Sequence, residues 1–136
     1  MSLENTLPEK LRHAGLRPTQ QRLALAELLF GQGDRHVCAE DLYAEAFHAS
    51  VPVSLATVYN TLNQFRAAGL LRELAIEGDR SYFDTNTSDH FHFFDNEKLT
   101  LMDIDAGGVT VTGIPAVPKG KVIDRVDVIV RLRDQD

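Results

Sequence analysis

Two histidines separated by one residue, His90 and His92, are the clearest candidates for chemistry in this chain. In an extended strand, residues two apart place their side chains on one face, so both imidazoles would reach the same site. Imidazole nitrogens bind divalent transition metals. Phe91, Phe93 and Phe94 are apolar neighbours of a kind that usually belongs to a core. The pattern predicts metal ligands, and two polar histidines on an exposed strand face are the plainer alternative.

A second candidate region, residues 54–71, has the pattern of a helix with one polar face. Ser54 is a suitable N-cap and Gly69 a suitable end, and the apolar residues between them recur at helical spacing. Short uncharged side chains opposite this stripe could contact base edges and phosphates without charge repulsion. The stripe is Leu55, Val58, Leu62 and Phe65, and the polar face is Thr57, Asn60, Thr61 and Gln64. The pattern predicts a helix that reads DNA.

The elements around these residues predict two domains and an α+β fold. The first domain, residues 1–85, is expected to be an N-terminal winged helix-turn-helix that binds DNA. The second, residues 89–136, is expected to be a small α/β or β-rich dimerisation domain. Its three strands are too few to cover their own apolar faces, so this domain is expected to form a homodimer or to pack on the first domain.

The predicted elements follow from capping residues, helical periodicity and strand alternation. Helices are expected at residues 3–14, 20–30, 39–48 and from 55 to Gly69, and a hairpin at residues 70–75 and 81–84. Further strands are expected at residues 90–94, 99–104 and 126–132, with a possible short one at 109–112.

Composition limits the location and the partners of the protein. The chain has 136 residues, 43% of them hydrophobic, which is enough for one domain or two small ones. It has no apolar run that would span a membrane and no signal-peptide pattern, and its single cysteine, Cys38, excludes an internal disulfide. We therefore expect a cytoplasmic protein. The net charge of −6 opposes non-specific DNA binding, so DNA affinity must come from a local cluster, dimerisation or bound cations.

Three motifs resemble the ferric uptake regulator family. They are HVCAEDLY at residues 36–43, LATVYNTLNQF at residues 55–65 and the His-x-His of residues 90–92. The resemblance runs from about Leu11 to Asp103. It implies a dimeric, metal-responsive, winged-helix regulator of transcription rather than an enzyme, with a double-stranded DNA operator as its partner.

The resemblance also implies a divalent metal site between the two domains, which would hold zinc, manganese or iron. Three imidazoles and two carboxylates would form it, a donor set that suits these ions. The implied ligands are His36, Asp84, His90, His92 and Asp103. Aspartate stands at positions 84 and 103, where the family more often has glutamate. The structural zinc held by four cysteines in many members is not expected, because Asp95 and Lys98 occupy the first cysteine pair.

Within the family, the short, cysteine-poor chain most resembles the haem-responsive iron response regulator branch. His90 and His92 would then also bind haem, and Phe91, Phe93 and Phe94 would give apolar surface to the flat macrocycle instead of belonging to a core. The regulator would bind DNA at low iron and leave it when haem competes for these ligands. The short Cys-Pro haem motif of some members is missing. The alternative is a regulator that Mn²⁺, Zn²⁺ or Fe²⁺ activates as a corepressor, without a haem response. DNA contacts are implied for Arg17, Arg22, Ser54, Thr57, Tyr59 and Asn60.

Two other functions and the role of Cys38 stay open at this point. A metal-dependent hydrolase could use three histidines and two aspartates, but the chain has no nucleophile–base pair and no His-Glu-x-x-His motif. A winged helix used only for protein contacts would lack the polar helix face. Cys38 could be a semi-buried replacement for Ser or Thr at a helix N-cap, or a thiolate that ligates haem.

Overall fold

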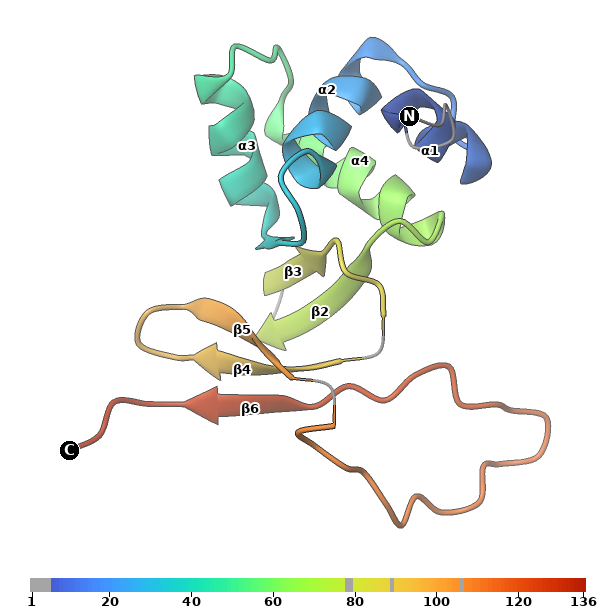
Figure 1. Ribbon diagram of the computed structural model, residues 1–136, viewed down its shortest axis with the longest axis vertical. Coiled ribbons are helices and arrows are strands. Elements are labelled where there is room, and N and C mark those ends of the chain that lie inside the picture. The colour runs from blue at the N-terminus through green and yellow to red at the C-terminus, as the bar shows by residue number, and fades with distance from the viewer. Residues whose placement is uncertain (1–5, 78–79, 89, 106) are drawn as a thin grey trace. The chain divides into compact units, whose positions relative to one another are not determined.

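The computed structural model describes residues 6–77, 80–88, 90–105 and 107–136 (Figure 1). The chain divides into two compact units, residues 1–87 and residues 88–136. The first unit combines helices with a small sheet and the second contains a sheet, so the fold class is α+β, as predicted. Among the described residues, no helix is both long and apolar enough to cross a membrane.

Four helices form most of the first unit, and a side-chain cap sets the start of three of them. Thr6, Thr19 and Ser54 each accept a hydrogen bond from the backbone N–H three residues later. The helices are α1 (Leu7–His13), α2 (Gln20–Phe30), α3 (Ala39–His48) and α4 (Leu55–Ala67). The bounds of α2 and α3 are as predicted. Helix α1 begins at Leu7 because Thr6 caps it, and the first residues of the predicted helix lie outside the described part of the chain.

The core of the first unit lies between the four helices and the sheet. Helix α4 contributes Val58, Leu62 and Phe65, all fully buried. Two predictions about this helix were wrong. Thr61, predicted on the polar face, is 5% exposed, because it lies one helical turn from both Val58 and Phe65. Leu55, predicted in the apolar stripe, is exposed, because it stands in the first turn of the helix.

A three-stranded antiparallel sheet completes the first unit, in the order β1-β3-β2. Its strands are β1 (His36–Val37), β2 (Arg72–Glu77) and β3 (Arg80–Asp84). Strand β1 was not predicted, because two residues carry no periodicity. Strand β2 starts later than predicted, because Gly69 has a φ of +83° and the N–H of Leu70 bonds back to the carbonyl of Phe65, which closes α4. The predicted hairpin turn at residues 78–79 lies outside the described residues.

The sheet of the second unit has the order β5-β4-β6. Its strands are β4 (Phe91–Asp95), β5 (Thr100–Ile104) and β6 (Ile129–Leu132), with β4 antiparallel to β5 and parallel to β6. Strand β6 is shorter than the predicted residues 126–132, because its register against β4 begins only at His92, opposite Ile129. Residues 109–112, where a short strand was considered possible, form none, and their side chains are largely exposed.

Candidate functional site

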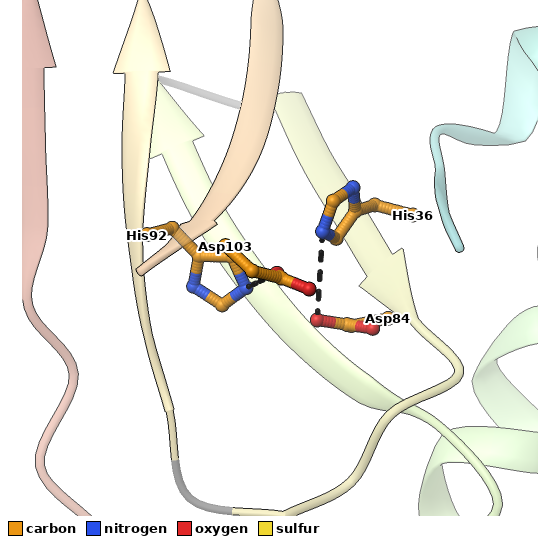
Figure 2. Close-up of side chains that lie close together, drawn as sticks. All are labelled: His36, Asp84, His92 and Asp103. Carbon is orange, nitrogen blue, oxygen red and sulfur yellow. Dashed lines mark ion pairs between the residues drawn. The ribbon is translucent and has the colours of Figure 1, made fainter. Parts of the chain in front are cut away.

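The first pair of potential metal ligands, His36 on the edge strand β1 and Asp84 on the central strand β3, lies in the sheet of the first unit. Strands β1 and β3 run antiparallel with these two residues directly opposite each other. The His36 Nε2 atom lies 3.8 Å from Asp84 Oδ2, too far for a hydrogen bond but within ion-pair distance (Figure 2). The Asp84 side chain is only 1% exposed, so its charge needs a partner.

The backbone around Asp84 fixes the direction of its carboxylate. Oδ1 accepts a hydrogen bond of 2.9 Å from the N–H of Asn86, a turn typical of aspartate. This bond uses one oxygen and leaves Oδ2 as the atom that faces His36. The His36–Asp84 pair is therefore oriented by the local fold, with one nitrogen and one oxygen directed toward each other.

The second group, the His90–His92–Asp103 cluster, lies in the second unit. His92 in β4 stands opposite Asp103 in β5, and His90 immediately precedes β4. The Nε2 atoms of both histidines lie 3.3 Å from Asp103 Oδ1, and Figure 2 shows the contact of His92. His92 is buried, with 1% of its side chain exposed, whereas the Asp103 side chain is 46% exposed.

The tautomer of His90 follows from its other nitrogen. Nδ1 lies 2.7 Å from the carbonyl oxygen of Ser88, and because a carbonyl only accepts, Nδ1 must donate. In the neutral ring, Nε2 then carries a lone pair toward an Asp103 oxygen that also carries lone pairs. Only a proton or a cation between these two atoms makes the contact favourable. This arrangement, in which a histidine donates one N–H to a carbonyl, is the usual support of a metal-bound imidazole.

The spacing within each group fits the coordination of a small divalent cation. Ligand atoms at about 2.0–2.2 Å from one tetrahedral ion lie about 3.3–3.6 Å from each other. The contacts of 3.8 Å in the first unit and 3.3 Å in the second are close to this range. Imidazole nitrogens and carboxylate oxygens suit zinc, manganese and iron. The five predicted ligands therefore form one pair and one three-residue cluster, each suited to a cation.

The predicted DNA-binding surface lies over α2 and α4 of the first unit. Tyr59 is 39% exposed and Asn60 is exposed. Asn60 is one of the residues around a polar hollow of about 320 Å³, which is lined by Thr19, Gln21, Arg22, Thr57, Asn60, Thr61 and Gln64. At the start of α4, the Ser54 hydroxyl oxygen accepts a hydrogen bond of 3.1 Å from the N–H of Thr57, and a second hydrogen bond of 3.0 Å joins the hydroxyls of Ser54 and Thr57.

Arg22 is held in place at this surface. Its guanidinium donates to the carbonyl oxygen of Arg17 at 3.0 Å and to Oε1 of Gln64 at 3.1 Å. The first bond explains the proximity of the two predicted arginines: Arg17 contributes its backbone here, and its own side chain is exposed. The second bond joins α2 to the polar face of α4. A fixed guanidinium at a polar surface is suited to a phosphate group.

The sequence analysis missed three residues that support these groups. Glu40 accepts a hydrogen bond of 2.6 Å from the hydroxyl of Tyr59, and Arg35 forms an ion pair with Glu45 on α3. Glu40 and Glu45 stand 19 and 10 residues from their partners, so no local spacing signals these contacts. Only the position of Arg35, immediately before His36, marks it as a neighbour of a candidate ligand.

Cys38, at the N-cap of α3, is 6% exposed. Burial raises the pKa of its thiol above the ordinary value. A raised pKa favours the neutral thiol, whereas haem and metal ligands are thiolates. Its burial thus favours the first of the two interpretations, a small residue that replaces Ser or Thr at the N-cap.

The sequence model of the ferric uptake regulator family matches residues 13–110. The ferric uptake regulation protein of Shigella flexneri is 43% identical over 82 residues, which are 60% of this chain and 55% of that protein. The chain thus spans about half the length of several relatives that it matches and 68% of the length of the ferric uptake regulation protein of Klebsiella pneumoniae.

Two solved structures have the same fold over nearly the whole chain. The ferric uptake regulator of Vibrio cholerae superposes with a TM-score of 0.75 and 24% identity, covering 95% of this chain and 100% of that one. The ferric uptake regulator from Pseudomonas aeruginosa, a structure with manganese, superposes with a TM-score of 0.72 and 26% identity. This match covers 99% of this chain and 100% of that one.

Proposed function

The chain belongs to the ferric uptake regulator family, and we propose that it is a sequence-specific DNA-binding regulator of transcription that responds to a divalent metal ion. One observation carries the proposal: a single winged-helix unit contains both a polar, exposed helix face and a histidine–carboxylate pair. Membership of this family argues against the metal-dependent hydrolase.

Duplex DNA is the partner that suits the face of α4. Uncharged Asn60 and Thr57 can meet base edges in the major groove, and the ring of Tyr59 can contact a thymine methyl. Arg22 and Arg17 supply positive charge for phosphates in a chain whose net charge is −6. Ser54 marks the start of α4, where a helix N-terminus favours a phosphate.

We propose that the His36–Asp84 pair and the His90–His92–Asp103 cluster bind one divalent cation together. Neither group alone supplies the four ligands of a closed tetrahedral site. The two groups belong to different units, so a shared ion would fix one unit against the other. Such fixation would raise the population of the arrangement that binds DNA, which gives a physical route from metal to DNA affinity. Manganese is a candidate ion, because the Pseudomonas aeruginosa regulator was solved with it.

We propose that the second unit forms a homodimer. Its described residues include several exposed large apolar side chains, a composition typical of a surface that a partner covers. They are Met102, Val111, Ile114, Val117, Val122, Ile123 and Val130. A two-fold dimer would bind a palindromic operator with one winged helix on each half-site.

Haem is the second candidate ligand, as expected for the iron response regulator branch. The observation in its favour is that the rings of His90 and His92 lie side by side, with centroids 4.5 Å apart. The apolar surface next to them is smaller than predicted. Strand alternation places only Phe94 on the face of His92, and Phe91 and Phe93 on the opposite face. Haem that binds both histidines would compete with the divalent ion and release the operator.

The proposal is tested by measuring DNA affinity with and without ligand. Duplexes selected from a random pool would be titrated by fluorescence anisotropy in EDTA, in Mn²⁺, in Zn²⁺ and with haem. We expect either metal to tighten binding to the selected duplexes. Release by haem would favour the haem-responsive alternative, and absence of duplex binding in every condition would refute the proposal.

A matched pair of variants separates the metal site from general damage. His36→Gln removes a proposed ligand, so the metal should no longer tighten DNA binding. His13→Gln makes the same change at an exposed histidine at the end of α1 and should keep the full metal response. Equal responses of the two variants would remove His36 from the site.

A further inference from the structure

Arg35 links the two chain segments that carry His36 and Asp84. Arg35 immediately precedes His36, and it lies opposite Thr85, which immediately follows Asp84. The N–H of Arg35 donates to the hydroxyl oxygen of Thr85 at 2.9 Å, and the N–H of Thr85 donates to the carbonyl oxygen of Arg35 at 3.0 Å. The backbone bond continues the contact between the two segments one residue beyond the His36–Asp84 pair, and the bond to the hydroxyl adds a side-chain link at the same place.

The side chain of Arg35 ties this backbone to two helices. Nη1 donates to the carbonyl oxygen of Leu28 in α2 at 3.0 Å and to Oε1 of Glu45 in α3 at 2.8 Å, and Nη2 donates to Oε2 of Glu45. Two parallel bonds between a guanidinium and a carboxylate are the strongest and most directional form of this pair. The bonding to Glu45 also raises the pKa of Arg35 above its ordinary value.

Strand β1 needs such a tether because it is only two residues long. Two residues give few ladder bonds, and His36 itself is partly exposed, with 19% of its side chain accessible. The position of the imidazole therefore depends on what holds the chain immediately before it. Arg35 is the residue at that point, and its partner Glu45 lies on a helix whose core side chains are fully buried.

We propose that Arg35, held by Glu45, is a positioning residue for the His36–Asp84 half of the metal site. The inference rests on the metal-responsive function proposed above. Arg35 touches no ion in this scheme; it sets the separation of the His36 nitrogen from the Asp84 oxygen. Loss of a residue that orients a metal ligand costs about 10–100-fold in affinity. We expect the lower end, about tenfold, because Arg35 bonds to the backbone next to the ligands and not to the imidazole itself.

The test compares the unmodified 136-residue chain with three variants in a competition titration of Mn²⁺ or Zn²⁺ against a chelating dye. Glu45→Gln keeps the shape of the side chain and removes its charge. Arg35→Lys keeps a positive charge but loses the guanidinium that forms two parallel bonds with Glu45. Both should weaken metal binding about tenfold. The control, Glu9→Gln, removes an exposed ion pair with Arg12 in α1 and should leave the affinity unchanged. An affinity within twofold of the unmodified chain for both test variants would overturn the proposal.

Amide hydrogen exchange in the metal-free protein gives an independent readout. Glu45→Gln should speed exchange at Val37 in β1 and leave β4 unaffected, because β4 lies in the other unit. Equal acceleration at both strands would indicate general destabilisation and overturn the positioning role. If the unmodified chain binds no metal, the proposed function fails while the exchange measurement still decides whether Arg35 positions His36.

Discussion

Replacing Asp103 by asparagine tests the metal site with little disturbance of the fold. The side chain is 46% exposed, so a change of nearly equal shape should alter the stability of the metal-free protein by less than about 0.5 kcal/mol. The same Oδ1 atom lies 3.3 Å from both His90 Nε2 and His92 Nε2. One substitution therefore removes a charged ligand that two histidines share.

The size of the effect follows from linkage between metal binding and unfolding. At a free metal concentration of 100 times Kd, binding stabilises the folded state by about 2.7 kcal/mol. Unfolding of 136 residues carries an entropy of about 0.29 kcal/mol per degree, so Tm should rise by about 9 °C. If Asp103→Asn weakens metal binding about 100-fold, the same metal concentration stabilises the folded state by about 0.4 kcal/mol and raises Tm by about 1.4 °C.

The assay is thermal unfolding followed by circular dichroism, in EDTA and with Mn²⁺ or Zn²⁺. Asp127→Asn is the matched control, because Asp127 is a partly exposed aspartate of the same unit, paired with Arg125 at 3.1 Å. The control should keep the full rise in Tm. A variant at position 103 that also keeps the full rise would show that Asp103 is not a ligand, and the coordination argued from its spacing would be wrong.

Other predictions concern DNA, assembly and haem. Arg22→Ala should weaken binding to all duplexes about equally and reduce the salt dependence of the affinity, measured by anisotropy at several salt concentrations; an unchanged salt slope would remove Arg22 from the interface. Asn60→Ala should cost about 1–3 kcal/mol at one base position if its contact is bidentate, and competition with single-base duplex variants would detect it. A fragment of residues 1–87, which has its own core, should be monomeric by light scattering, whereas the full chain should be dimeric. His90→Ala/His92→Ala should abolish the haem absorbance shift, and stoichiometric haem uptake by this double variant would place the haem site elsewhere.

Local patterns in the sequence were sufficient for the helices of the first unit. The caps at Thr19 and Ser54, the turn at Gly69 and the spacing of apolar residues act within about one helical turn, so they can be read without tertiary context. The α+β class and the family motifs follow from the same local information. The domain roles and the ligand assignments remain predictions.

The errors lie where the local pattern leaves the extent of packing open. Thr61 has a polar side chain, yet it lies one helical turn from both Val58 and Phe65, and the packing of α4 against the rest of the core covers it. Residues 109–112 can alternate as a strand, but a strand needs a neighbour to pair with, and sequence periodicity does not supply one.

The sequence by itself determined which residue types this protein offers to a ligand: a His-x-His motif, two aspartates and a polar helix face. Only the tertiary structure decided which of them meet. His36 and Asp84 stand 48 residues apart and become neighbours because β1 pairs with β3, and the same pairing brings Arg35 to Thr85. Tyr59 reaches Glu40 because α3 packs against α4. Strand register and helix packing are set by the burial of the whole core, so no local window of the sequence contains them.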